Sequence, residues 1–205
     1  MTAQKYTVPQ LRGQRVSLEP LVIEDANELL RAANEETSTY GFTTVPLESE
    51  AMTVYVGDLL GDQERGEVVP FVQRDVNTGA IVGMTRFMTL RSRPSDRFPY
   101  ALEVGGTWLS SSSQRTGINT EAKFLLLRFA FEEWGTARVE LKTDERNVRS
   151  RNAISRIGAT FEGVLRNYQP SLVVGEESMY RNTAIFSITN DEWPTAKARL
   201  HSMLR

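Results

Sequence analysis

The sequence predicts an α/β (α+β) fold, in which helices and strands are mixed along the chain. Short strand-like runs alternate with segments whose apolar residues recur at helical spacing. Two of these runs flank the turn-forming segment 75–79, which predicts an antiparallel hairpin. One long helix follows a strand-like run at 100–109. Because 205 residues with 40% hydrophobic content can fill a sizeable core, we expect a single domain over residues 1–205.

The first sixty residues are expected to contain one strand and two helices. Residues 15–21 alternate between polar and apolar, as a half-buried strand does. Asp25 and Glu28 have the spacing of a capping box, which predicts a helix that runs to about residue 33. A second helix is expected at 47–60, ending before Gly61.

The middle of the chain is expected to form three strands. The hairpin strands are placed at 68–74 and 80–89. Residues 91–99 contain two prolines and no apolar periodicity, so we expect a loop there. A third strand follows at 100–109, and the polar segment 110–113 connects it to the next helix.

The second half of the chain is expected to continue with alternating helices and strands. These elements are a helix at 119–134, a strand at 138–143, a helix at 148–157, strands near 160–169 and 178–188, and a C-terminal helix at about 190–204. The helix at 119–134 is apolar on more than one face, which indicates that it is largely enclosed by the core.

Charge and composition disfavour several kinds of partner. The formal net charge is −2 and both signs are intermixed, so we expect no nucleic-acid partner. With no cysteines, disulfides and thiolate-bound zinc are excluded, and we expect no metal. No apolar run approaches the roughly 20 residues of a membrane span, and residues 1–9 have no apolar signal core. We therefore expect a cytoplasmic protein with no membrane partner.

The turn at residues 114–119 is the strongest functional signal. A glycine lies just before the start of the long helix, where the first backbone N–H groups have no helical acceptor. The helix dipole adds partial positive charge at the same place, so an anion such as a phosphate can bind there without a metal. The alternative is a turn that merely starts a helix. A P-loop is disfavoured because the turn has no lysine at the required place.

Two motifs resemble those of the GNAT superfamily of acyl-CoA-dependent N-acetyltransferases. Gln114, Gly117 and Asn119 occupy the places of its first signature, with Asn119 where a small residue is usual. Residues 147–159 resemble its second signature. The opening run from Arg15 and the segment 102–105 look most like the Rim-type branch, which includes ribosomal-protein-alanine acetyltransferases. The resemblance covers about residues 11–190.

This resemblance implies a fold and a co-substrate. The fold is a mixed, mostly antiparallel central sheet with a splayed pair of central strands and helices on both faces. Gly105 and Gly106 would form a bulge that opens the pair, although a kink needed only for packing is the alternative. Acetyl-CoA would bind with its pantetheine arm along the exposed strand edge, in the manner of an added strand. The expected contact residues are Trp108, Leu109, Gln114, Arg115, Thr116, Gly117, Ile118, Asn119, Thr120, Asn147 and Ser150.

Acetyl transfer to a primary amine needs a base, an oxyanion site and a leaving thiol. We expect Glu103 to be the base, although a salt-bridged or solvated strand carboxylate is the alternative. The backbone N–H groups of residues 106–108 are the expected oxyanion donors. The family commonly has a tyrosine four residues after Ser150, but this chain has Ile154 there. The resemblance to the Rim-type branch implies that Ser150 donates to the sulfur instead. A helix-start serine and, for Asn147, a plain N-cap are the alternatives.

The acceptor amine is left open by the sequence. A protein N-terminus and a small-molecule amine are both compatible with the resemblance, as are a monomer and a homodimer. Five residues could line an acceptor cleft, namely Tyr40, Phe42, Arg91, Arg93 and Tyr168. The missing tyrosine and Asn119 also keep open a second hypothesis, a catalytically silent module that binds coenzyme A.

Overall fold

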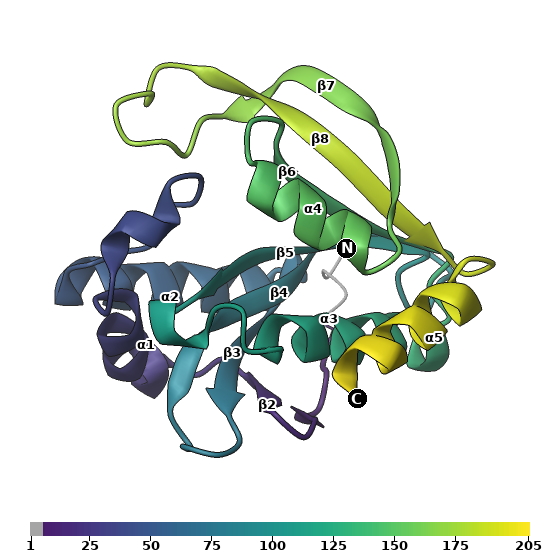
Figure 1. Ribbon diagram of the computed structural model, residues 1–205, viewed down its shortest axis with the longest axis horizontal. Helices are drawn as coiled ribbons and strands as arrows, with labels where there is room; N and C mark the ends of the chain where they lie inside the picture. The colour runs from purple at the N-terminus through teal and green to yellow at the C-terminus, as the bar shows by residue number, and fades with distance from the viewer. Residues whose placement is uncertain (1–5) are drawn as a thin grey trace.

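The computed structural model describes residues 6–205, and it is built around an eight-stranded sheet (Figure 1). The strands are β1 Leu11–Arg12, β2 Val16–Pro20, β3 Val68–Asp75, β4 Ile81–Arg91, β5 Ala101–Leu109, β6 Arg138–Asp144, β7 Thr160–Pro170 and β8 Tyr180–Thr189. Their order in the sheet is β1-β2-β3-β4-β5-β6-β8-β7. Among these strands, β5 and β6 pair in parallel, and every other pair is antiparallel. The expected mixed, mostly antiparallel sheet is therefore confirmed.

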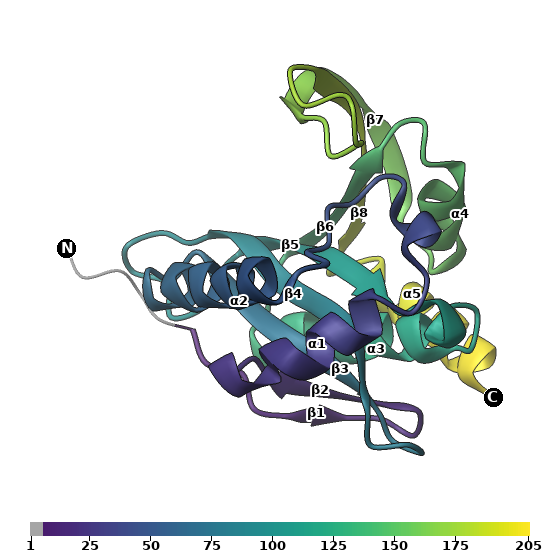
Figure 2. The same cartoon turned by 90° about the vertical axis from the view of Figure 1, so that its left-hand side faces the viewer.

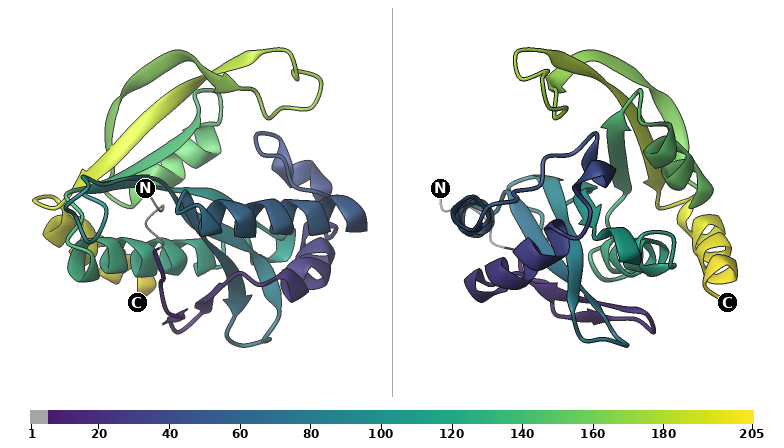
Figure 3. Two further views of the ribbon diagram at one scale, coloured as in Figure 1. Left: turned by 180° about the vertical axis from the view of Figure 1, so that it is seen from behind. Right: turned by 60° about the vertical axis from the view of Figure 1, so that its left-hand side comes forward.

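Helices cover both faces of this sheet. The α-helices are α1 Ala26–Ala33, α2 Ser49–Glu64, α3 Ile118–Arg128, α4 Val148–Arg156 and α5 Trp193–Leu204. Short 3-10 turns are η1 Ile23–Asp25, η2 Thr37–Tyr40 and η3 Ser111–Ser113, and η4 Phe129–Glu133 is a π-helical turn. The right-hand view of Figure 3 shows α2 on one side of the strands and α3 on the other. Helices on both faces are thus confirmed.

Two apolar clusters hold these layers together. The larger one joins α3 and α5 to one face of the sheet, and its fully buried members include Phe87, Leu102 and Leu126. The smaller one joins α1 and α2 to the opposite face through Met52 and Met84. Because α3 is enclosed by the first cluster, packing holds its N-terminal end in place beside β5.

The N-terminal region departs from the sequence prediction in two ways. A two-residue strand, β1, precedes β2, and the carboxylate of Glu121 on α3 accepts the N–H groups of Gln14 and Arg15 in the turn between them and of Val16 at the start of β2. The predicted capping box is absent, because the carboxylate of Asp25 accepts from Val22 N–H at 3.0 Å instead. Glu28 binds Arg74 and the N–H of Ile81, so it ties α1 to the β3–β4 hairpin.

Two helix ends also differ from the predictions. Helix α2 continues through Gly61 to Glu64, since its buried residues Met52, Val56 and Leu59 hold the helix against the sheet. The predicted helix at 119–134 starts one residue earlier and ends in the π-helical turn η4. In that turn the N–H of Trp134 bonds to the carbonyl of Phe129 at 3.2 Å, and the Trp134 ring packs against four other aromatic rings.

The central strands separate after a short stretch of pairing. Strand β5 pairs with β6 only from Ala101 to Glu103, and β6 then continues alone beside β8. Figure 2 shows β6, β8 and β7 rising away from the layer formed by β3, β4 and β5. The splayed pair expected from the sequence is therefore confirmed, and within residues 6–205 the β5 edge from Val104 to Leu109 has no partner strand on the β6 side.

Residues 6–205 contain no helix with both the length and the apolar content that a membrane span requires. The sequence-based expectation that residues 1–9 have no apolar signal core falls partly on residues 1–5, which lie outside the described part of the chain.

Candidate functional site

The turn between β5 and α3 has the backbone geometry of an anion site. Gly117 is the N-cap of α3 with φ 93°, and Arg115 has φ 64°. Alternation of left-handed residues with ordinary ones turns successive N–H groups toward one point. Within residues 6–205, the N–H groups of Arg115, Thr116 and Gly117 have no protein acceptor. Free N–H groups and the positive end of the α3 dipole therefore converge at this turn.

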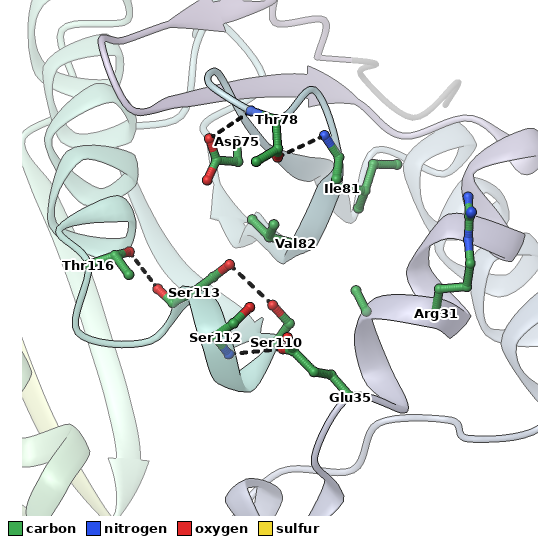
Figure 4. A pocket seen from close by; sticks show the side chains of 12 residues that line it. Arg31, Glu35, Asp75, Thr78, Ile81, Val82, Ser110, Ser112, Ser113 and Thr116 are labelled. Atoms are coloured by element: carbon green, nitrogen blue, oxygen red, sulfur yellow. Dashed lines mark hydrogen bonds between the residues drawn. The ribbon is translucent and has the colours of Figure 1, made fainter.

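Side chains hold the turn in place. The amide nitrogen of Gln114 donates to the carbonyl of Leu109 at 3.1 Å, and its amide oxygen accepts from Arg149 on α4 at 3.1 Å. Thr116 donates to the carbonyl of Ser113 at 2.7 Å. On the α1 side the carboxylate of Glu35 accepts the N–H of Ser112, as Figure 4 shows, so this N–H is already used. The N–H groups that are left for an anion are those of the turn itself.

The glycine pair in β5 forms the expected bulge. Trp108 pairs with Met84 and Gly105 pairs with Arg86, so Gly106 and Thr107 together face the single residue Thr85. Gly106 has φ 57°, a conformation that suits glycine. The bulge lies on the part of β5 that has no β6 partner, so free backbone groups border the opening between the two strands.

Glu103 lies where β5 and β6 part, and its carboxylate is held by neighbours. The residue is only 8% exposed, and its carboxylate forms an ion pair with Lys142 at 3.1 Å and accepts from Thr89 at 3.3 Å. Burial by itself would lower the pKa of Lys142, but the carboxylates of Glu103 and Glu140 outweigh it, so this pKa is raised. Lys142 therefore stays charged beside Glu103.

The ion-paired cluster continues along β6. Glu140 bonds to Arg91, Arg138 and Lys142. Burial would raise its pKa, but these three cations lower it to about 2. Arg91, which the sequence suggested for an acceptor cleft, is thus an ion-pair partner on the β4 side of this cluster.

Helix α4 brings the second motif to the opening. Asn147 is the N-cap, and its side-chain oxygen accepts from the N–H of Ser150 at 3.0 Å. The capping role of Asn147 is therefore seen directly, while its amide nitrogen is left for another contact. Ser150 is half-buried in the first turn. Ile154 is buried in the core, so the α4 surface carries no hydroxyl at that position.

Not every residue of the predicted cofactor set can offer its side chain. Ile118 is buried in the α3 core, so it can contact the cofactor only through its backbone. The hydroxyl of Thr120 already accepts from Arg156 at 3.0 Å. Asn119 has a buried side-chain oxygen without a hydrogen-bond donor. The remaining members lie along the β5 edge, in the turn or at the start of α4, namely Trp108, Leu109, Gln114, Arg115, Thr116, Gly117, Asn147 and Ser150.

The other four residues suggested for an acceptor cleft lie in different parts of the structure. The ring of Tyr40 meets Trp108 edge-on at 6.0 Å, and Tyr168 accepts from Lys142 at 3.3 Å. Arg146 lies over Phe42 at 5.7 Å, so the loop after α1 meets the start of α4. Arg93 instead lies over Tyr100 at 5.8 Å. Tyr40 and Phe42 thus come from the connection between α1 and α2, and Tyr168 comes from β7.

Three cationic residues near the opening were not found from the sequence. Lys142 pairs with Glu103, Lys123 lies beneath the bulge on the α3 face, and Arg86 lies beside it on the α2 face. Each is an isolated basic residue in a strand or helix. Only the strand register could have brought them to the bulge, and a single sequence does not determine that register.

Comparisons with known proteins agree with this geometry. The chain has 27% identity with a GCN5-related N-acetyltransferase from Brucella melitensis, covering 98% of this chain and 87% of that one, with a TM-score of 0.82. A protein described as an acetyltransferase from T. thermophilus has 30% identity over 98% of this chain and all of that one (100%), with a TM-score of 0.80.

A more distant structure shares the fold. Mycobacterium smegmatis RimJ in complex with CoA-disulfide has 22% identity over 92% of this chain and 88% of that one, with a TM-score of 0.75. No curated protein sequence gives a significant match. The family model "Acetyltransferase (GNAT) domain" matches residues 15–160, which is well over half of the chain. With the split strands, the bulge and the glycine turn before α3 in place, the chain therefore belongs to the GNAT acetyltransferase family.

Proposed function

We propose that this protein transfers an acetyl group from acetyl-CoA to a primary amine, by direct attack of the amine within a ternary complex. The observation that carries the proposal is the continuous path from the free N–H groups at Arg115–Gly117 along the unpaired β5 edge to Glu103. Acetyl-CoA supplies an activated acetyl thioester. The rest of the chemistry falls to the residues that line this path.

The path suits a molecule with an anionic end and an amide-containing arm. The turn at residues 114–120 would hold the diphosphate, with Arg115 adding charge. The backbone at Trp108 and Leu109 and the amide nitrogen of Asn147 would hydrogen-bond the pantetheine amides. The likeness to RimJ in complex with CoA-disulfide supports this use of the fold.

Glu103 is proposed as the group that takes a proton from the attacking ammonium, directly or through one water. Its place where the paired strands part supports this role, because the acetyl group is proposed to lie in the opening between β5 and β6. Lys142 would hold the Glu103 carboxylate in position and compensate its charge before the proton arrives. The neutral amine then forms the new C–N bond.

The oxygen and sulfur of the thioester need separate partners. N–H groups of residues 106–108 are proposed to receive the negative charge that develops on the carbonyl oxygen. As the C–S bond breaks, the hydroxyl of Ser150 is proposed to donate a hydrogen bond to the sulfur. A thiol with a pKa of about 8.5 leaves more readily than an amine of about 10.4, so the departing thiolate needs little further help.

The finer assignments follow the Rim-type branch. We propose a single domain, a cytoplasmic location, and an acceptor that is a protein N-terminus or a small amine, with the protein acting as a monomer or homodimer. A silent module that binds coenzyme A is the second candidate. It is favoured by the ion pair between Glu103 and Lys142 and by the buried Ile154 on α4.

The test follows free-thiol release from acetyl-CoA across peptides and small amines. Glu103→Gln is expected to lower kcat by about 10²-fold or more while the Kd for CoA stays the same, because the base acts on the amine. Glu48→Gln, an exposed glutamate before α2, serves as the control. Normal turnover by the Glu103 variant would remove this residue from the mechanism. CoA binding without release for any acceptor would favour the silent module.

A further inference from the structure

Arg86 on β4 lies beside the bulge at Gly105 and Gly106, and its guanidinium has few hydrogen-bond partners. One of its terminal nitrogens donates to the hydroxyl of Tyr55 on α2 at 3.3 Å, and its buried Nε has no acceptor among the described residues. Within residues 6–205 no carboxylate forms an ion pair with it. A guanidinium has five N–H donors and stays charged at any ordinary pH. Partial burial of such a group without an anion is unfavourable, so an external acceptor is expected.

Two further unsatisfied donors border the same face. Trp108, which is 4% exposed, has an indole Nε1 with no acceptor in the described part of the chain, and the hydroxyl of Tyr40 has no partner there either. Burial, together with the nearby Glu35, raises the pKa of Tyr40 to about 12, so its hydroxyl keeps its proton. An indole and a guanidinium can only donate. The missing partner on this face is therefore a hydrogen-bond acceptor, as an anion would be.

Arg86 lies close to Glu103, the proposed base, so an anion bound by Arg86 would lie close to the attacking amine. A Cβ built on Gly105 would lie 2.9 Å from the Glu103 carboxylate, and a Cβ on Gly106 would lie 2.7 Å from the Arg86 guanidinium. The two charged groups thus flank adjacent glycines, yet they form no ion pair with each other. In the register, Arg86 is opposite Gly105 and Glu103 is opposite Met88, so they are diagonal neighbours.

We propose that the acceptor is a small amine that carries a carboxylate within a few bonds of the amine. Its ammonium faces Glu103, and its carboxylate binds Arg86 in the bidentate manner that suits a guanidinium. Free amino acids have this chemistry, and so do peptides whose first residue is acidic. This inference rests on the proposed acetyl transfer and adds the substrate class. The reaction itself is unchanged: an amide C–N bond forms, the thiol leaves and the ammonium proton passes to Glu103.

The experiment compares each amino acid with its carboxamide, and peptides beginning with Asp with those beginning with Asn. For the wild type, kcat/KM is expected to be about tenfold or more higher for the acid of a pair. Arg86→Gln should remove this preference by raising KM for the acid while leaving the amide unaffected. Arg86→Lys should restore part of it, and Arg12→Gln, an exposed arginine, should change nothing. The free amino acids and the peptides separate the two sources of the carboxylate.

Two kinetic results would overturn the inference. One is equal rates for acid and amide in the wild type, and the other is an equal loss for both with Arg86→Gln, which would indicate a purely structural arginine. Calorimetric binding of the same pairs to the CoA complex separates this inference from the proposed function. If no acceptor is turned over but the acid still binds more tightly than the amide in an Arg86-dependent way, the site is real and acetyl transfer is not. Equal binding of acid and amide would remove the site.

Discussion

Lys123 offers a strong test of the physical reasoning, because it is a buried cation without an anion. The residue is 7% exposed, and its ammonium donates to Thr107 at 2.6 Å and to Thr85 at 3.4 Å. These two threonines also share a hydrogen bond of 2.8 Å. Among residues 6–205 no carboxylate pairs with Lys123, and burial alone lowers its pKa from 10.5 to about 7. We consider the substitution Lys123→Met, which keeps a similar length and removes the charge.

The direction of the pH dependence of stability follows from whether Lys123 is protonated in the folded and in the unfolded state. Between about pH 7 and the ordinary pKa of 10.5, the unfolded chain holds the Lys123 proton and the folded protein does not. Wild-type stability should therefore rise with pH in this window, and below about pH 7 it should carry the full cost of the buried charge. One pKa unit corresponds to about 1.36 kcal/mol, so the difference between wild type and Lys123→Met should change by about 2–3 kcal/mol from pH 6.5 to 9.

Urea denaturation at a series of pH values measures this difference directly. Lys123→Met should be the more stable protein at pH 6.5 and should lose that advantage as the pH rises. Lys197→Met is the matched control, because this ammonium lies at the surface against Glu132. Parallel stability curves for wild type and Lys123→Met would show that the buried lysine does not titrate as argued.

Three other substitutions test neighbouring parts of the fold and site. Gly117→Asp should weaken CoA binding in calorimetry by about tenfold or more, since it adds a negative charge and a side chain at φ 93°; unchanged affinity would contradict the anion site. Glu121→Gln should lower the free energy of unfolding by about 2–4 kcal/mol through weaker bonds to the β1–β2 turn, and an unchanged urea midpoint would refute this. Asn147→Ala should cost about 1 kcal/mol as a lost cap, and a simultaneous fall in CoA affinity would add the cofactor contact.

Most strands and helices could be predicted because their signals are local. The hairpin turn at residues 75–79 and the apolar pattern of α3 lie within short stretches of sequence. Strand β1 could not be found this way, since two residues have no periodicity and its turn depends on Glu121, more than a hundred positions away. The capping box predicted at Asp25 is absent for a related reason: the Asp25 carboxylate accepts from Val22, and Glu28 pairs with Arg74 on β3.

The candidate site also combines features that could be predicted from the sequence with features that could not. The turn with Gly117, the glycine pair and the Asn147 cap are visible as motifs because backbone conformation depends on nearby residues. The partners of Glu103 are not visible, since Lys142 reaches it only through the parallel register of β5 and β6. The catalytic roles of Glu103 and Ser150, the oxyanion donors at residues 106–108 and the coenzyme A contacts stay predictions.

The bulge itself explains why basic residues occupy both faces of the sheet beside it. Opening β5 leaves the carbonyl of Gly105 near the hydroxyls of Thr85 and Thr107, and Lys123 binds both hydroxyls from the α3 side. On the other face, a side chain at Gly106 would collide with the Arg86 guanidinium, so the missing side chain leaves room for that cation. Lys123 completes its bonds within the protein, whereas Arg86 does not. We therefore assign support of the bulge to the lysine and substrate binding to the arginine, and the pH curves and the acid–amide pairs test these two roles independently.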